Sequence, residues 1–309
     1  MSSFQCKCIE TYEGVIIANI ADLHTHTCYS DGDLKPKELI KLAKNKGIKI
    51  LSITDHDTVD GLCEARWECD KQNITLIPGI EFTTETEYSG IEVHILGYNF
   101  DPEDSGLLRM TDHAKQNAKD YCMKVCAALE SHDMEIDYSV LDNVKGIITK
   151  HDITLSVQNK VMNNYDFHNT WLSDDSPLDI SMEKFPAKKA IKTIHRAGGK
   201  AVCAHILRTL EQNNRMSLLP YMSESLIRCG LDGFEVFYAN SSKEQVNTMY
   251  ELCSAQGLIM TGGSDFHGEN RTGRCQLGEY NSYTAELFSD ISGILVNSYN
   301  GNIMEKAIA

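Results

Sequence analysis

The stretch GVIIANIADLHTHTCYSDG, residues 14–32, decides the fold, because an apolar run leads directly into two histidines and an aspartate. The run predicts a strand over residues 15–23. Side chains alternate along a strand, so His24 and His26 at its carboxyl end should point the same way. Asp31 follows in a Ser-Asp-Gly loop. Together they predict half of a metal site, although so short a pattern is also typical of ordinary polar residues at a strand end.

The length and composition are those of a globular protein. A chain of 309 residues can form one large domain, or one domain with an insertion. Apolar residues make up 42% and charged residues 24%, which is ordinary for a chain that folds in water. No run approaches the length of a membrane span, and the first residues lack the pattern of a signal peptide. We therefore expect a cytoplasmic protein that does not bind a membrane.

The net charge of −15 argues against an extended nucleic-acid-binding surface, which needs many Lys and Arg contacts to phosphates. It is compatible with a small anionic substrate held at a local cationic centre, such as a metal cluster. The eleven cysteines are scattered and include no C-x-x-C pair, so we expect reduced thiols. The sequence carries no signal for a particular oligomeric state.

Apolar runs typical of strands alternate with helical patterns through most of the chain. The expected strands after the first span residues 48–54, 74–82, 92–100, 200–205, 232–239 and 258–267. The clearest helical patterns span residues 35–47, 187–199 and 242–257. Alternation of this kind predicts an α/β fold with parallel strands joined by crossover helices.

Residues 104–186 break this alternation. They begin with a long polar helix over about residues 107–132, and further helix-like and loop-like segments follow. We interpret this segment as an inserted, mostly helical domain that caps the site or binds substrate. Residues 1–103 and 187–309 would then form the metal-binding barrel.

Metal-ligating residue types follow the predicted strands one after another. All but His94 fall clearly at or just past the carboxyl end of a strand, which is the face where parallel β/α barrels build their active sites. The nine residues are His24, His26, Asp31, His56, Glu81, His94, His205, Asp265 and His267. The other histidines that lie on predicted helices or in the insertion are expected to be surface or packing residues: His113, His132, His168 and His195.

These motifs resemble those of the PHP (polymerase and histidinol phosphatase) family. The matching stretches are DLHTHTCYSDG (22–32), ITDHD (53–57), PGIEF (78–82), EVHILGY (92–98), AH (204–205) and GSDFH (263–267). They are similar to the branch of small phosphoesterases that act on nucleotide phosphates. The stretch GIITKHDITLSV (146–157) and the following NYDFHNTWL (164–172) look like that branch's insertion.

The resemblance implies a distorted, TIM-like barrel of about seven strands that holds two or three divalent metal ions. By position, the first ion is held by His24, His26, Glu81 and Asp265, the second by Glu81, His94 and His205, and the third by Asp31, His56 and His267. Nitrogen and oxygen ligands without thiolate suit Mn²⁺, Fe²⁺ or Zn²⁺. We expect a bridging water to become hydroxide and attack phosphorus, with Asp265 and His267 as part of the catalytic centre.

Two positions depart from the family pattern. Ala-His-Pro reads Ala204-His205-Ile206 here, and Gly-Arg-Pro-His reads Ile148-Thr149-Lys150-His151. Lys150 can replace the charge of the missing arginine but not its bidentate geometry. Lys150, His151 and Arg271 are our candidates for substrate binding, and His151 for protonating the leaving group.

Other residues near the motifs leave more than one interpretation open. His151 is about as well explained as a histidine satisfied where the insertion meets the barrel. Arg271 and Arg274 could equally belong to a solvated loop, while Cys28 and Asp57 are expected to support the site rather than bind metal. Lys115 and Lys119 are further candidates for a remote anionic group of the substrate.

Three functions compete on this evidence. The leading hypothesis is a metal-dependent phosphoesterase acting on phosphate monoesters of small nucleotides, such as a 3′,5′-bisphosphate, or on short oligonucleotide ends. The second is a phosphatase of another small metabolite, histidinol phosphate included. The third is a non-catalytic PHP module, against which the complete set of ligands argues.

Overall fold

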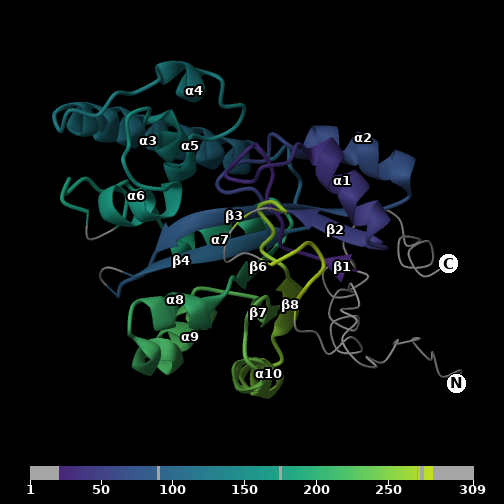
Figure 1. Ribbon diagram of the computed structural model, residues 1–309. Helices are drawn as coiled ribbons and strands as arrows, with labels where there is room; N and C mark the ends of the chain where they lie inside the picture. Colours follow the sequence, from purple (N-terminus) through teal and green to yellow (C-terminus); the bar gives the residue numbers. More distant parts are fainter. Residues whose placement is uncertain (1–20, 89–90, 174–175, 270, 272–274, 281–309) are drawn as a thin grey trace, which may run out of the picture.

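The computed structural model describes residues 21–88, 91–173, 176–269, 271 and 275–280 (Figure 1). The strands are β1 (Ala21–Asp22), β2 (Ile50–Ile53), β3 (Thr75–Glu85), β4 (Glu92–Tyr98), β5 (Phe185–Pro186), β6 (Lys200–Cys203), β7 (Gly233–Tyr238) and β8 (Ile259–Gly263). The helices are α1 (Pro36–Asn45), α2 (Leu62–Gln72), α3 (Ser105–Glu130), α4 (Tyr138–Asp142), α5 (Lys150–Ser156), α6 (Asn164–Trp171), α7 (Ala187–Arg196), α8 (Ile206–Gln212), α9 (Leu219–Arg228) and α10 (Lys243–Gln256). A 3₁₀ turn, η1 (Met216–Leu218), precedes α9.

The sheet closes almost completely on itself. Its strand order is β1-β2-β3-β4-β6-β7-β8, with the short β5 paired to β3. The two ends of this order meet, because the amide of Leu23 donates to the carbonyl of Gly262 at 3.2 Å and Thr25 bridges to Phe266. Seven strands therefore surround one interior, which confirms the expected distorted barrel.

The expectation of parallel strands throughout was wrong for β4, which runs antiparallel to both β3 and β6. β4 is seven residues long and follows β3 through a short connection. Without a crossover helix in that connection, the chain turns back and β4 runs antiparallel to β3. This reversal places the amino end of β4 at the edge where the other strands end. His94, the third residue of β4, thus reaches the same edge as the other candidate ligands.

Two expected element boundaries also differ from the structure. Glu81 was expected at a strand end, but β3 continues to Glu85, because its second half pairs with β4 over residues 79–85. Glu81 therefore lies inside the strand, opposite Leu96 of β4. Of the first expected strand, residues 15–20 lie outside the described range and only Ala21 and Asp22 form β1.

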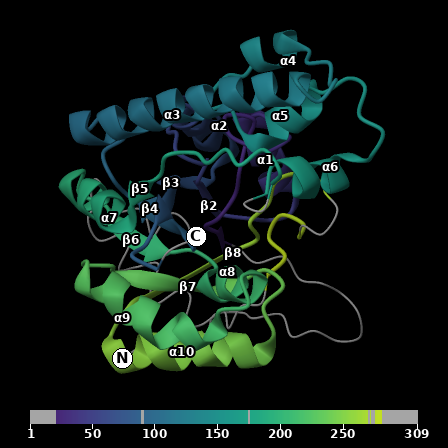
Figure 2. The same cartoon turned by 90° about the vertical axis from the view of Figure 1, so that its left-hand side faces the viewer.

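The helices that cover the barrel bury one apolar face each. In α1, Leu39, Ile40 and Ala43 are fully buried at the spacing of one helical face, and α7 buries Ile191 and Ile194 in the same way. Figure 2 shows α7 alongside β4 and β6, and α8, α9 and α10 grouped near β7. Within the described residues, no helix is long and apolar enough to cross a membrane.

Helix α3 takes part in two separate hydrophobic cores. Its first half contributes Leu107 and Met110 to the barrel core, whereas its second half contributes Val125 and Leu129 to a smaller core shared with α4, α5 and α6. Figure 1 shows these four helices together on one side of the sheet. That residues 104–186 form an inserted domain stays a prediction. The structure does show that one continuous helix, α3, joins the two cores.

This arrangement makes α3 sensitive to a cavity at its far end. Leu129 is fully buried in the smaller core, while Leu108 on the same helix is 37% exposed. We expect Leu129→Ala to lower the free energy of unfolding by about 2–5 kcal/mol, because it leaves a cavity. Leu108→Ala should change it by less than about 0.5 kcal/mol. Urea unfolding followed by circular dichroism measures both, and equal effects of the two variants would contradict the two-core description.

Candidate metal centre

Glu81 lies at the middle of the residues that the strand ends bring together. It is fully buried, and each of its carboxylate oxygens faces a different set of histidines. Oε2 lies 3.1 Å from His24 Nε2 and 3.2 Å from His26 Nε2. Oε1 lies 3.0 Å from His94 Nδ1 and 3.2 Å from His205 Nε2. One carboxylate is thus placed to serve two neighbouring sites.

The candidate ligands form three overlapping groups, and within each group the ligand atoms lie within 4.8 Å of one another. The groups are His24, His26, Glu81 and Asp265; His56, Glu81 and His94; and His26, Asp31, His56 and His267. The structure therefore gathers all nine expected residues, with His205 joined through Glu81. The grouping differs from the expected one in detail, because His56 stands beside Glu81 and His94 as well as beside Asp31.

Positive backbone φ angles mark two of these residues. His205 has a φ of 25° and Asp265 a φ of 51°, values that non-glycine residues rarely adopt. Backbone strain of this kind persists where the surrounding structure enforces it, commonly at functional sites. Gly263 shows how tight the packing is, because an added Cβ would lie 2.4 Å from the Cβ of His24. The GG of TGGSDFH therefore allows β8 to approach His24.

Glu235 is a site residue that the sequence did not single out. It is 3% exposed in β7, its Oε1 lies 2.9 Å from His24 Nδ1, and its Oε2 accepts from the amide of His205 at 3.0 Å. A carboxylate on the far nitrogen fixes the tautomer and orientation of a metal-ligating histidine. The signal was present, since GFEVFY is an otherwise apolar strand with one acidic residue.

Two buried aspartates hold the loops that carry the histidines. Asp55 accepts hydrogen bonds from the amide and hydroxyl of Thr27 and from the hydroxyl of Ser30. Asp57 accepts from the amide of Thr83 at 3.1 Å, and its burial raises its pKa to about 7. Asp57 thus acts as the support that the sequence predicted.

Burial and charge act on the titration of these groups in opposite directions. Burial disfavours the charged form of His26, but the carboxylates of Asp265 and Glu81 outweigh it and raise its pKa to about 9. Burial dominates at His56, where it lowers the pKa to about 3. At Asp31 burial opposes ionisation, yet His267 holds the pKa well below its usual range. Across the centre, carboxylates therefore raise the pKa of a neighbouring imidazole and imidazoles lower the pKa of a neighbouring carboxylate.

The donor set fits divalent metal ions. Several buried ligand atoms lack a hydrogen-bond partner, among them both ring nitrogens of His26, Oδ1 of Asp31, and Nδ1 of His56 and of His205. Leaving such atoms unpaired in the interior costs free energy, which coordination to an ion would remove. Imidazole and carboxylate are ligands of several divalent metals, so the residues present suit these ions.

One residue of the predicted insertion reaches the rim of this centre. His151, at the start of α5, lies with its Nδ1 3.4 Å from Nη1 of Arg271. Arg271 in turn donates to the carbonyl of Asp31 and forms an ion pair with Asp33 at 2.8 Å. Burial lowers the pKa of His151, and the charge of Arg271 adds to this effect. Arg271 is thus held against the loop that carries Asp31, and its contact with a substrate stays a prediction.

The other cationic candidates have different outcomes. Lys150 is the first residue of α5 and adjoins His151 in sequence. Lys115 forms an ion pair with Asp60 at 2.7 Å, and Lys119 lies exposed on α3. Arg274 lies outside the described residues. The contacts of His151 and Arg271 tie both residues to the loop of Asp31 at the metal centre.

Arg208 and Tyr238 also contact the centre and were missed in the sequence. Nη1 of Arg208 lies 3.2 Å from Oδ2 of Asp265, and the Tyr238 hydroxyl donates to the same oxygen at 3.1 Å. They line a pocket of about 250 Å³ together with Asn240 and Gln245. No sequence motif distinguished Arg208, because α8 was not among the expected helices.

The remaining histidines and cysteines behave as expected. His113 and His132 make edge-on contacts with Phe185 and Trp171, and His195 pairs with Asp232 at 2.6 Å, all away from the nine ligands. His168 lies in α6. The nine cysteines within the described residues are free, whereas Cys6 and Cys8 lie outside that range.

Comparison with known proteins agrees with this geometry. The chain is 31% identical to a 5′-3′ exoribonuclease of Haemophilus influenzae over 80% of this chain and 89% of that protein. It is 27% identical to the 3′,5′-nucleoside bisphosphate phosphatase of Chromobacterium violaceum, over 84% and 90% respectively. A solved structure of a candidate metal-dependent phosphoesterase from Bifidobacterium adolescentis superposes with a TM-score of 0.77 at 25% identity, covering 91% of this chain and 96% of that one.

These relatives confirm the sequence-based expectation of a phosphoesterase from the branch that acts on nucleotide phosphates. The family model of the PHP domain matches residues 22–295, a range that includes every residue of the metal centre described above. The chain belongs to the PHP domain family.

Proposed function

We propose that this enzyme hydrolyses phosphate monoesters of small nucleotides, such as a 3′,5′-nucleotide bisphosphate, or of short oligonucleotide ends, with two or three divalent ions as cofactors. The observation that carries the proposal is Glu81, whose two oxygens face different histidine sets. A carboxylate that faces two sets of ligands would suit a centre with more than one metal ion, and the relatives include a bisphosphate phosphatase and an exoribonuclease.

The ions would be held by the nine residues that the barrel gathers at one edge of its sheet. His24, His26, Glu81 and Asp265 would hold one, Glu81 with His94 and His205 a second, and Asp31 with His56 and His267 a third. When bound, such ions lower the pKa of a coordinated water and offset the negative charge of a phosphoryl group. Mn²⁺, Fe²⁺ and Zn²⁺ all suit nitrogen and oxygen donors.

The chain's own side chains would orient the substrate around these ions. Arg208 presents its guanidinium beside Asp265, where it can donate to a phosphoryl oxygen. On the other side, Arg271 and His151 stand beside Asp31. Burial lowers the pKa of His151 and so favours its neutral form, which suits a hydrogen bond to the substrate better than a standing positive charge does. Catalysis by Asp265, His267 and His151, and substrate binding by Lys150, His151 and Arg271, are parts of this proposal.

A phosphate-release screen tests the substrate class. The metal-loaded enzyme is offered 3′,5′-nucleoside bisphosphates, nucleoside monophosphates, short 5′-phosphorylated oligonucleotides and histidinol phosphate. We expect nucleotide substrates to be preferred by kcat/KM. A preference for histidinol phosphate would instead support the second hypothesis, and no release from any compound would favour a non-catalytic module.

A cytoplasmic location is part of the proposal and fits the free cysteines.

The proposal predicts that metal binding depends on the Glu235 carboxylate, which contacts Nδ1 of His24. The wild-type protein should carry two or three divalent ions per chain by elemental analysis. Glu235→Gln should weaken metal binding about 10–100-fold, because it removes the charge that orients His24 and contacts the His205 amide. Glu251→Gln on the exposed surface of α10 is the matched control. Less than one ion per wild-type chain, or equal metal content in the two variants, would contradict the assignment.

Asp265 should be needed for turnover rather than for folding. Asp265→Asn replaces a charged ligand by a neutral one, and we expect kcat to fall by ~10²-fold or more. Circular dichroism should show an unchanged fold, and elemental analysis should show fewer ions. Near-wild-type turnover at full metal loading would refute the role of Asp265.

Recognition of a remote group should be separable from the reaction. Changing Lys150 and His151 together to Ala should raise KM strongly for a nucleotide bisphosphate, because contacts to its second phosphate are lost. Hydrolysis of a small aryl phosphate, which lacks that group, should change little. Lys124→Ala, at an exposed position of α3, is the control for loss of a surface charge. Equal losses on both substrates would place His151 in the chemistry, and no loss on either would make the predicted insertion a structural cap.

A further inference from the structure

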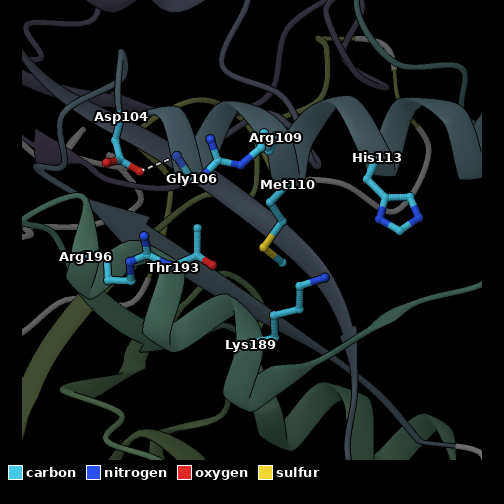
Figure 3. A pocket seen from close by; sticks show the side chains of 8 residues that line it. All are labelled: Asp104, Gly106, Arg109, Met110, His113, Lys189, Thr193 and Arg196. Atoms are coloured by element: carbon cyan, nitrogen blue, oxygen red, sulfur yellow. Dashed lines mark hydrogen bonds between the residues drawn. The ribbon is translucent and has the colours of Figure 1, made fainter.

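A second polar pocket lies between α3 and α7, outside the barrel. Its volume is about 300 Å³, and Arg109 and Met110 of α3 face Lys189, Thr193 and Arg196 of α7 across it. Figure 3 shows Met110 and Lys189 directed into the space between the two helices, with Arg196 and Arg109 toward one end. Three full positive charges therefore line one small cavity in a protein whose net charge is −15.

The two guanidinium groups converge at the end of the cavity where Asp104 lies. One Nη2 atom each of Arg109 and Arg196 lies 3.8 Å, and Oδ1 of Asp104 3.0 Å, from the point that a Cβ on Gly106 would occupy. Across the part of the chain that the structure describes, no ion pair joins a carboxylate to Arg109, Lys189 or Arg196. All three side chains are exposed, so water screens part of the repulsion between their like charges, and a bound anion would reduce the rest.

The other polar groups of the pocket have defined roles. Asp104 caps α3, since its Oδ1 accepts from the amides of Gly106 and Leu107 at 2.8 and 2.9 Å. Its carboxylate is therefore engaged by backbone donors at one end of the cavity. Lys189 is held in place over the ring of Phe185, with Nζ 4.1 Å from the ring centroid. The Thr193 hydroxyl adds a neutral donor to the lining.

The pocket is separate from the metal centre. Arg196 is the last residue of α7. The chain then runs the whole length of β6 before it reaches His205. Asp104 likewise follows the end of β4, whereas His94 lies near its start. Arg196 and Asp104 therefore both lie at the edge of the sheet opposite the metal centre, and the length of a strand separates them from it. An anion bound here would not be in position for hydrolysis.

We propose that this pocket is a binding site for a small phosphate-type dianion, held chiefly by Arg109 and Arg196. Guanidinium groups present paired donors that match the oxygens of a phosphate, and Lys189 and Thr193 would complete the ligand's hydrogen bonds. Such an anion joins α3 to α7. Because α3 continues into the second hydrophobic core, the bound anion stabilises the junction between that core and the barrel.

Equilibrium dialysis of the metal-loaded full chain against labelled inorganic phosphate tests this site. The double variant R109Q/R196Q should bind one phosphate fewer per chain, or bind it ~10-fold or more weakly. The control variant is K71Q/R228Q, which removes two exposed cations elsewhere and should bind phosphate as the wild type does. Binding that is equal in all three proteins, or lowered equally in both variants, would overturn the proposal.

Two further measurements give the test independent readouts. Phosphate should raise the melting temperature of the wild type and the control more than that of R109Q/R196Q, because only they retain the α3–α7 ligand. Turnover of a small aryl phosphate should stay unchanged in R109Q/R196Q, and a large loss would show that the pocket belongs to the catalytic site. A nucleoside 5′-phosphonate that binds more tightly than inorganic phosphate, and loses affinity in the same variant, would identify the anion as part of a nucleotide.

Discussion

The burial of the Glu81 carboxylate is the constraint on which the rest of the site depends. A fully buried carboxylate is stable only when positive or hydrogen-bonding groups surround it. Burial works against its ionisation, but His24, His56 and His94 hold its pKa well below the usual range. His24 follows β1, His56 follows β2 and His94 lies near the start of β4. The barrel must therefore close before all three histidines can surround the Glu81 carboxylate. The long β3 places Glu81 inside the sheet rather than at its rim, where imidazoles can approach both oxygens.

The sequence predicted the parts of this site that repeat a local pattern. An apolar strand followed by His, Asp or Glu is visible in residues 20–26 and 258–267 without any structure, and the convergence of such ends follows from the barrel. The direction of β4 could not be predicted, because seven strand residues look the same in either orientation. Glu235 was invisible for a different reason: its role depends on His24 and His205, which are distant in sequence and meet it only across the sheet.

Arg208 shows a third limit of the sequence. Its position three residues after His205 had no periodic or motif-like signal, and its contact with Asp265 requires both the turn at His205 and the end of β8. Ile206 stands where the family pattern has proline, so this segment lacks the stiffness of a proline ring. In the structure Ile206 is 1% exposed and begins α8, so apolar packing holds the loop in place of a rigid ring. The substitution is thus compensated by burial.

Charge explains how an acidic protein can select a phosphate. The proposed ligands include three carboxylates, Asp31, Glu81 and Asp265. Two divalent ions would outweigh these three carboxylates by one positive charge, and three ions would outweigh them by three. The surrounding surface of a chain with a net charge of −15 repels a long polyanion, and this repulsion extends over about a Debye length of 8 Å at physiological salt. A small nucleotide or the end of a short strand can enter the positive centre while keeping the rest of its charge away from that surface. The α3–α7 pocket and the metal centre are two separate, local regions of positive charge. Within the described residues they do not join into a continuous track for a nucleic-acid backbone.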